Sequence, residues 1–511
     1  MLMRAIAGLL ALFGASVAHA EWREAQTAHF IIRSDEAERS LIERAQQLEV
    51  LHWLMRTTTG ADDSANGQRV RIYVVPTTIT LRRAMGETGP SNTAAGFYRT
   101  GREGPIGVIA RDQGALGNTL LQHEYAHHFM LQYMRGHFPP WYVEGFAELV
   151  GSSTFDRPGE VAFGRAPPHR QGSLWYGDWT PLATMFAPRD PADRRAGNAS
   201  YGQYWLVTHY LTFDQSRRGQ LADYLSRLAR GETTAQAAAA FPGGLEALDR
   251  DARAYLHANS FRYQNVPIPA AAQVTPTIRT LGRDEVDLMP VLFQVERPRP
   301  VAEMAEVVAR TAELAARYPT SAPVARAHAL ALLSAQRWAE AEQAADATLA
   351  LAPDDVRALT YKGLAQLQRI GATGGDAAKM ASARAARQFI IRANRRDPED
   401  AVPLFAYWDS FRLTGETPTD SALDGFAKAT DLQPTAVGRK LELARAFIQR
   451  RRFAEARPVL EPIAYSPHRS GAQAAALAML RWIEGGAATP PPSPNTPISG
   501  DDNGEAPAPA A

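Results

Sequence analysis

The chain of 511 residues contains no cysteine. Without thiols, neither disulfide bonds nor thiolate metal ligands are available, so any metal site must use nitrogen and oxygen ligands. An excess of charge of one sign is also lacking, because 55 basic residues face 54 acidic ones and the formal net charge is +1. A nearly neutral chain creates no strong field toward polyanions, and we therefore expect no nucleic-acid partner.

Long apolar runs are lacking after the first twenty residues, so we expect no membrane span in the mature protein. The start of the chain combines Arg4, an apolar run over residues 5–17 and a small-x-small ending at Ala18-His19-Ala20. This pattern is typical of a signal peptide, here residues 1–20, that is cleaved after Ala20; the alternative is an uncleaved anchor. The alanine- and arginine-rich composition indicates a bacterial source, and we expect a periplasmic or secreted protein.

An HExxH motif at residues 123–127, with the sequence HEYAH, is the strongest chemical signal in the chain. On a helix, residues four apart share one face, so His123 and His127 can direct both imidazoles at one metal ion. Glu124 would stand beside that ion, where zinc hydrolases use a carboxylate as general base toward an activated water. Because HExxH also occurs by chance, the motif alone does not define a site.

A second helix is predicted directly after the motif, over residues 141–152, since Pro140 suits a first helical turn. Glu144 and Glu148 are four residues apart and share one face of this helix. A metzincin-type site is excluded, because Tyr133 occupies the position where a third histidine is needed. The two helices can instead direct the two motif histidines and Glu144 at a common point.

Residues 21–263 resemble the peptidase MA-like gluzincins of bacteria, on the strength of HEYAH followed by EGFAE at residues 144–148. The resemblance implies a zinc ion, Zn2+, as the cofactor. It also implies the role of each site residue: metal ligands His123, His127 and Glu144, general base Glu124, and Glu148 as a hydrogen-bond partner of a ligand histidine.

Gluzincins also need a donor for the oxyanion that forms at the substrate carbonyl, often a tyrosine or histidine from the helical lower half. Tyr201 is our first candidate, with Tyr204 and His209 behind it, although core packing is the commoner role for each. His128 faces about 100° away from His127 on a helix, which favours packing over metal ligation. His137 follows the helix-ending Gly136, where a loop position is expected.

The sequence predicts an α+β zincin-like domain over residues 21–265, with a small mixed sheet plus helices. Alternation and apolar runs predict strands at residues 29–33, 69–76, 96–100 and 106–112. Helical spacing predicts helices that begin near Ser34, between Asn118 and Gly136, and over residues 201–213, 220–231 and 244–258. Residues 153–200 show little periodicity and are expected to form a long loop over the cleft.

Residues 266–300 hold many prolines and are interpreted as a linker with a small hairpin. Residues 301–484 are alanine- and leucine-rich helix pairs in which WAEA at residues 338–341 returns as FAEA at 453–456. These resemble tetratricopeptide repeats, an all-α superhelix; the alternative is an ordinary helical domain. Residues 485–511 are proline- and alanine-rich, which predicts a disordered tail.

These features together predict an exported zinc metallopeptidase that hydrolyses peptide bonds in a peptide or protein substrate. Helical repeats commonly bind proteins, so the C-terminal half is expected to dock a substrate or a protein partner. Two alternatives stay open at this point. One is a repeat-based scaffold whose peptidase-like domain is inactive but retains zinc, and the other is a gluzincin fold that acts on something other than a peptide bond.

Overall fold

The structure is a computed structural model that describes residues 21–63, 67–85, 96–134, 136, 138–187, 201–465 and 471–486. The predicted signal peptide, His137 and all but the first two residues of the predicted tail lie outside this part of the chain. None of the described helices is long and apolar enough to cross a bilayer.

A six-stranded mixed sheet forms the N-terminal part, with the order β4-β5-β3-β2-β1-β8. Strand β3 pairs in parallel with β2 on one side and with β5 on the other. The pairs β1–β2, β1–β8 and β4–β5 are antiparallel. The small mixed sheet is therefore confirmed, and β1 and β8 are additions that the sequence did not predict. The bounds are β1 Arg23–Gln26, β2 Phe30–Ser34, β3 Val70–Val75, β4 Gly96–Gly101, β5 Gly104–Ala110 and β8 Thr277–Thr280.

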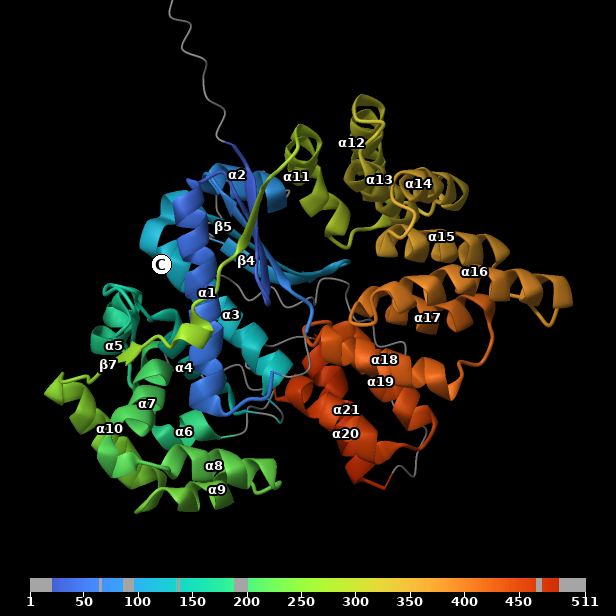
Figure 1. Ribbon diagram of the computed structural model, residues 1–511. Helices are drawn as coiled ribbons and strands as arrows, with labels where there is room; N and C mark the ends of the chain where they lie inside the picture. The colour runs from blue at the N-terminus through green and yellow to red at the C-terminus, as the bar shows by residue number, and fades with distance from the viewer. Residues whose placement is uncertain are drawn as a thin grey trace, which may run out of the picture.

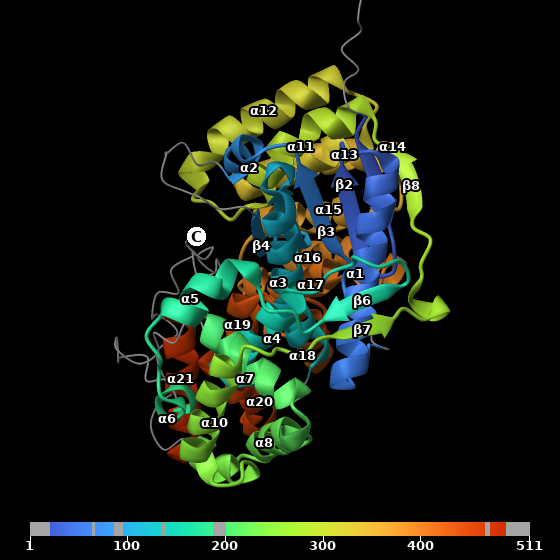
Figure 2. The same ribbon diagram turned by 90° about the vertical axis from the view of Figure 1, so that its left-hand side faces the viewer.

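The sheet is the middle layer of three, and its central strand β3 is apolar on both faces. Ile72 and Val74 pack toward helices α1 (Glu38–Thr59) and α3 (Gly114–Tyr133). Tyr73 and Val75 pack toward α2 (Thr78–Met85) and α11 (Arg283–Glu296) on the other side. Alternate side chains of a strand point to opposite faces, so one strand supplies both cores. Figure 2 shows α1 and α3 lying over the strands.

A helical lower half follows the sheet and carries the second predicted motif. Its helices are α4 (Pro140–Gly151), α5 (Gln171–Tyr176), α6 (Leu182–Phe186), α7 (Tyr201–Phe213), α8 (Gln220–Ala229), α9 (Thr234–Ala237) and α10 (Gly244–Ala258). The segment predicted as a long loop contains α5, α6 and β6 (Glu160–Phe163) in its described part, and β6 pairs with β7 (Gln264–Pro267). Elements of four to six residues are too short to show periodicity in the sequence.

Residues 266–300, interpreted from the sequence as a linker, contribute β8 to the edge of the sheet and form helix α11. One face of α11 places Met289 and Phe293 against the sheet, while the opposite face places Val291 and Val295 against later helices. Glu296 at its end accepts two hydrogen bonds from Arg71 of β3, each of 2.6 Å. Helix α11 is therefore shared by both halves of the molecule.

The C-terminal half is a succession of helices that pack against their neighbours in sequence, which confirms the expected helix pairs. The bounds are α12 Met304–Arg317, α13 Ala322–Ser334, α14 Trp338–Leu351, α15 Val356–Ile370, α16 Ala377–Arg396, α17 Ala401–Thr414, α18 Asp420–Leu432, α19 Val437–Gln449, α20 Phe453–Ala464 and α21 Gly471–Glu484. Two turns repeat one backbone geometry, since Gln336 has φ 59° and Arg451 has φ 56° at the same distance before WAEA and FAEA.

These helices form an arc, and the β4–β5 hairpin points into it (Figure 1). At the tip of the hairpin, the backbone carbonyl of Glu103 accepts a hydrogen bond of 3.0 Å from Arg357 of α15. The Glu103 carboxylate accepts a hydrogen bond from the hydroxyl of Tyr361 and lies 3.8 Å from the guanidinium groups of both Arg71 and Arg357. Burial alone would raise the pKa of Glu103, but the surrounding arginines lower it to about 2.

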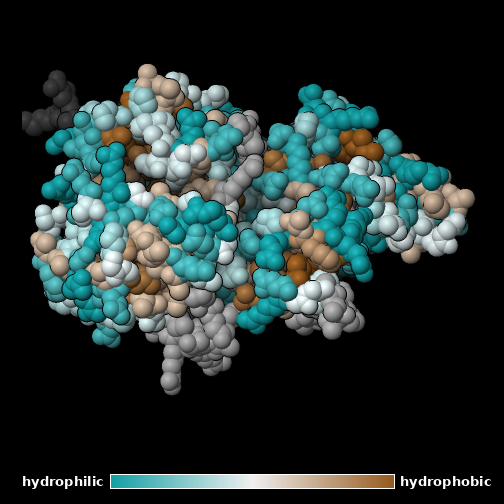
Figure 3. All heavy atoms as spheres, turned by 90° about the horizontal axis from the view of Figure 1, so that it is seen from below, coloured by the Kyte–Doolittle hydropathy of each residue, from teal (hydrophilic) through white to brown (hydrophobic). Residues whose placement is uncertain are grey.

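The face of the molecule drawn in Figure 3 is mostly hydrophilic, with hydrophobic side chains in small separate groups. Part of the inner surface of the helical arc is covered by the hairpin through Glu103. Another part is covered by Gln68, which lies just before β3 and contacts Asp400 and Gln433. The two halves are thus held together by polar contacts as well as by the apolar faces of α11.

We expect Glu103→Gln to lower the free energy of unfolding at pH 7 by about 3 kcal/mol, because buried guanidinium groups lose a carboxylate partner. The folded-state pKa of about 2 lies below the unfolded value of about 4.3, so this stabilisation is present above pH 4.3 and is lost as the pH falls toward 2. Urea unfolding at pH 7 and pH 3 measures it, and the effect at pH 3 should be roughly half as large.

The matched control is Glu455→Gln, since Glu455 is an exposed carboxylate in the first turn of α20, paired with Arg452 just before that helix. It should leave the urea midpoint unchanged. An equal effect of Glu103→Gln at both pH values would show that the charge of Glu103 does not stabilise the fold.

Candidate metal centre

Helix α3 carries the HExxH motif and packs directly against α4, which carries both predicted carboxylates. The contact is close at Gly151, where a Cβ atom would meet the Thr119 carbonyl oxygen and the His123 Cβ, each at 3.2 Å. The predicted start of α3 at Asn118 is wrong, because the helix begins at Gly114. The side-chain Oδ1 atom of Asn118 instead accepts a hydrogen bond of 2.6 Å from Arg44 of α1.

Three side chains from these helices converge, as the sequence predicted. The Nε2 atoms of His123 and His127 are 3.1 Å apart. Glu144 Oε2 lies 3.6 Å from His123 Nε2 and 3.5 Å from His127 Nε2. Each residue thus offers one ligand atom to a shared space, and the three residues are buried or half-buried.

The spacing of these atoms fits a tetrahedral zinc ion. A triangle with sides of 3.1, 3.5 and 3.6 Å has a circumscribed circle of radius about 2.0 Å. Zinc binds histidine nitrogen and carboxylate oxygen at about 2.0–2.2 Å, and tetrahedral ligands at that distance are about 3.3–3.6 Å apart. No side chain has to move to bring the three atoms within ligand distance of one point.

The charges of the site also favour a cation. Burial would raise the pKa of the Glu144 carboxyl, but His127 and His123 hold it well below its ordinary value. Burial would likewise lower the pKa of His123, yet the hydrogen bond to Glu144 and the charge of Glu148 raise it to about 9. A buried carboxylate needs a positive partner, which a proton on His123 or a metal ion can provide.

Glu148 lies behind His123, in the position that the resemblance implies. Its Oε1 atom is 3.4 Å from His123 Nδ1, which leaves Nε2 directed at the converging ligand atoms. The same carboxylate is held by Arg170, whose Nε and NH2 atoms donate at 3.0 and 2.7 Å, and by His169 Nε2 at 3.1 Å. Burial would raise the pKa of Glu148, but His169, His123 and Arg170 lower it to about 2.

His169 and Arg170 were missed by the sequence reasoning. They lie on the short turn before α5, in the segment that was predicted as a loop. The histidine and arginine are adjacent there with no spacing that relates them to Glu148, 21 and 22 residues earlier. Only the return of the chain over α4 brings them to the carboxylate.

The two predicted catalytic side chains both lie near the ligand atoms. Glu124 is half-buried on α3 beside His123, close enough for its charge to contribute to the raised pKa of that histidine. The Tyr201 ring, at the start of α7, lies 6.5 Å from the His123 ring, and the Arg170 guanidinium stacks over it at 4.7 Å. Burial and the charge of Glu144 raise the pKa of Tyr201, so its hydroxyl stays protonated at neutral pH.

The other candidates take part in packing. His209 is fully buried, with Nε2 shared between the Gly164 and Arg262 carbonyl oxygens and Nδ1 in contact with the Tyr255 hydroxyl. Tyr204 is buried on the next turn of α7, and its ring is 6.1 Å from that of Tyr201.

His128 points away from the ligand atoms. It is buried, and its Nδ1 atom contacts the Tyr98 hydroxyl of β4 at 2.5 Å. Burial lowers the pKa of His128 to about 3, so this imidazole is neutral and serves as a packed, hydrogen-bonded core side chain.

Comparisons with known proteins leave the family of this chain open. No protein-family model matches the sequence, and no curated protein matches it. Among solved structures, MamA MSR-1 C2 matches with 17% identity over 35% of this chain and 92% of its own, at a TM-score of 0.24. A MamA mutant matches with 18% identity over 35% of this chain and 95% of its own, also at 0.24. Likeness at this level assigns neither an activity nor a partner.

Gly145, the residue after Glu144, lies at the contact between α4 and α7. A Cβ atom here would overlap the Thr208 hydroxyl and the Tyr204 carbonyl oxygen of α7. The glycine therefore lets α4 and α7 approach closely, and the backbone next to Glu144 is fixed by that contact. The EGFAE sequence thus has a packing role at its second position as well as carboxylates at its ends.

We expect Gly145→Ala to destabilise the protein by about 2 kcal/mol, because the new methyl group forces α4 and α7 apart. Urea unfolding measures the loss. The matched control is Gly438→Ala on α19, where a Cβ atom meets nothing within 4 Å; this variant should be as stable as the wild type or slightly more so. Equal stability of both variants would contradict the close α4–α7 contact.

Proposed function

We propose that this protein is an exported zinc-dependent metallopeptidase of gluzincin type. The observation that carries the proposal is the set of spacings among His123 Nε2, His127 Nε2 and Glu144 Oε2, which suits one tetrahedral ion. Glu148 supports it, since a metal-ligating histidine ordinarily has a carboxylate or carbonyl partner on its other nitrogen.

Zinc, when bound, supplies a Lewis acid that polarises a peptide carbonyl and makes a water molecule acidic enough to be deprotonated near neutral pH. His123, His127 and Glu144 would hold the ion, because two neutral imidazoles and one carboxylate form a donor set that zinc prefers. Glu124 accepts the proton of the attacking water and passes it to the leaving amine.

Tyr201 is proposed as the donor to the oxyanion. Its hydroxyl is protonated at neutral pH, and Arg170, stacked on its ring, also fixes Glu148. One arginine therefore positions both the tyrosine and the carboxylate behind His123. A donor whose position is fixed before the reaction stabilises developing negative charge without a reorganisation cost.

The helical arc is proposed to contact a protein partner or to present a substrate. The hairpin already occupies the surface around Arg357 and Tyr361, so the partner surface must lie on other parts of the arc. The competing function is a protein-binding scaffold with an inactive, zinc-retaining domain. Zinc content and peptide cleavage of the wild type and of Glu124→Gln distinguish this scaffold from a peptidase.

Glu124→Gln should retain one zinc ion per chain and lose cleavage of a mixed peptide library by about 10²–10⁴-fold, because only the general base is removed. Zinc is counted by elemental analysis, and cleavage by mass spectrometry. Chelation of the metal should abolish cleavage by the wild type, and added zinc should restore it.

The control for this variant is Glu246→Gln, which removes an exposed carboxylate of α10 in the same domain and should leave both readouts unchanged. Equal zinc in wild type and Glu124→Gln with no cleavage by either protein would exclude the peptidase and favour the scaffold.

Tyr201→Phe should lower kcat by about 10²-fold with little change in KM or zinc content, because the hydroxyl acts on the transition state and not on the bound substrate. Steady-state kinetics on the best library peptide measure this split. Tyr176→Phe, at a tyrosine that is 91% exposed, serves as the control. A change confined to KM would assign Tyr201 to substrate binding.

A further inference from the structure

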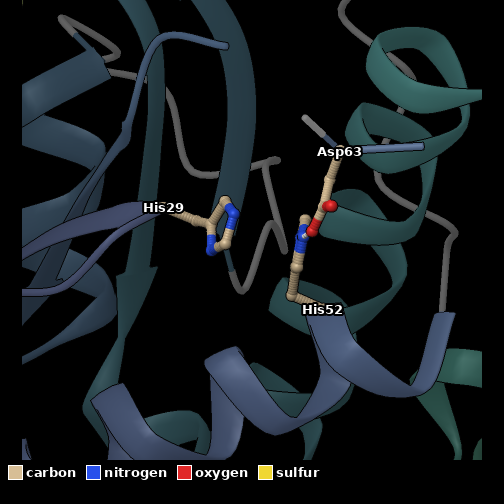
Figure 4. A group of neighbouring side chains, drawn as sticks. All are labelled: His29, His52 and Asp63. Atoms are coloured by element: carbon tan, nitrogen blue, oxygen red, sulfur yellow. Dashed lines mark hydrogen bonds and ion pairs between the residues drawn. The ribbon is translucent and has the colours of Figure 1, made fainter. Parts of the chain in front are cut away.

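A second group of metal-ligating side chains lies outside the site described above. His29 precedes β2, His52 lies on α1, and Asp63 lies on the loop that follows α1. One possible ligand atom of each lies within 4.8 Å of the others. Figure 4 shows the three side chains facing one another from separate segments of the chain.

The two histidines are oriented by partners on the opposite ring nitrogen. His29 Nδ1 lies 2.7 Å from Glu49 Oε2, and Glu49 also accepts from the His29 backbone N–H at 3.0 Å. His52 Nδ1 lies 2.7 Å from the Tyr125 hydroxyl. Each Nδ1 is thus engaged, which leaves Nε2 of both rings as the ligand nitrogens. A carboxylate on the far side of an imidazole is the usual arrangement behind a metal ligand.

Asp63 completes the group from the loop. Its Oδ2 atom lies 3.1 Å from His52 Nε2, and its Oδ1 atom accepts a hydrogen bond of 3.1 Å from Arg56. The 3.1 Å separation equals that between the histidine nitrogens of the first site, and it is near the spacing of two ligands on one zinc ion.

We propose that His29, His52 and Asp63 form a second binding site for a divalent cation of the zinc class, with a structural role. Two imidazoles and one carboxylate favour zinc over magnesium or calcium, which prefer oxygen ligands. Because His29 and Asp63 are each about 20% exposed, an ion can enter from the surface and keep a water ligand.

The site would connect four segments of a protein that has no disulfide bonds. Its ligands come from the start of β2, from α1 and from the loop after α1, and Tyr125 links it to the helix of the HExxH motif. A cation at this site fixes the loop against α1 and thereby stabilises α1, against which α3 packs. It contributes to folding, whereas the first site serves catalysis.

Binding requires one change in the ring geometry. The His29 and His52 rings are stacked, with centroids 3.6 Å apart and an interplanar angle of 21°. Imidazole lone pairs lie in the ring plane, so those of stacked rings do not converge on one point. His29 must therefore tilt away from the buried His52 when the ion binds, and Glu49 on its Nδ1 atom limits that tilt.

The experiment uses the full chain without a polyhistidine tag, stripped of metal and titrated with Co2+ and Zn2+ against a chromophoric chelator. His123→Ala/His127→Ala removes the first site and should still bind one equivalent, with visible Co2+ absorption of a four-coordinate site. Adding His29→Gln or Asp63→Asn should abolish that equivalent, and adding Glu49→Gln should weaken it about 10–100-fold. Adding His257→Gln, at an exposed histidine of α10, is the control and should change nothing.

Because His52 is buried, the test relies on His29 and Asp63, which are each about 20% exposed. Far-UV circular dichroism confirms that each variant is folded. The proposal would be overturned if the His123→Ala/His127→Ala variant bound no metal. It would also be overturned if that variant still bound one metal ion per chain after His29→Gln and after Asp63→Asn were added. Either result leaves the first site untouched, since that site is counted in the wild type and in the His29→Gln single variant.

Discussion

Two buried carboxylates, Glu144 and Glu148, set the condition that the rest of this structure has to meet. A carboxylate away from water is unfavourable unless cations and hydrogen-bond donors surround it. The chain provides such partners through the two histidines of α3 and through His169 and Arg170 on the turn before α5. In our proposal a zinc ion is a further positive partner. The close packing of Gly145 against α7 fixes the position of α4, and therefore of both carboxylates.

Local patterns in the sequence were sufficient for the parts of the site that lie on single helices. The spacing of His123 from His127 and of Glu144 from Glu148 follows directly from helical periodicity, and the structure brings these side chains together. Strands β2 to β5 were also predicted, because each is a continuous apolar or alternating run. Nothing in those patterns depends on the path of the distant chain.

What the sequence did not predict depends on contacts between distant segments. Strand β8 is recognisable only as a partner of β1, about 250 residues earlier, since TIRT alone has no strong alternation. Helix α11 was not predicted, because the prolines around it and Pro290 within it are typical of a linker. Arg170 and His169 acquire their role only when the turn before α5 returns to Glu148. Asn118 has the chemistry of a helix cap, yet it lies inside α3, and its side chain contacts Arg44 of α1.

The Tyr98–His128 contact links features that are otherwise far apart in the chain. Glu103, at the tip of the β4–β5 hairpin, is held by the helical arc, and Tyr98 of the same hairpin contacts His128 on the helix that carries the candidate metal ligands. Local opening of the arc would therefore remove support from α3, and we expect the two to unfold together. The helices of the arc thereby act as part of the core of the N-terminal half. A chain cut after residue 300 would lose this support and expose the tip of its hairpin to water.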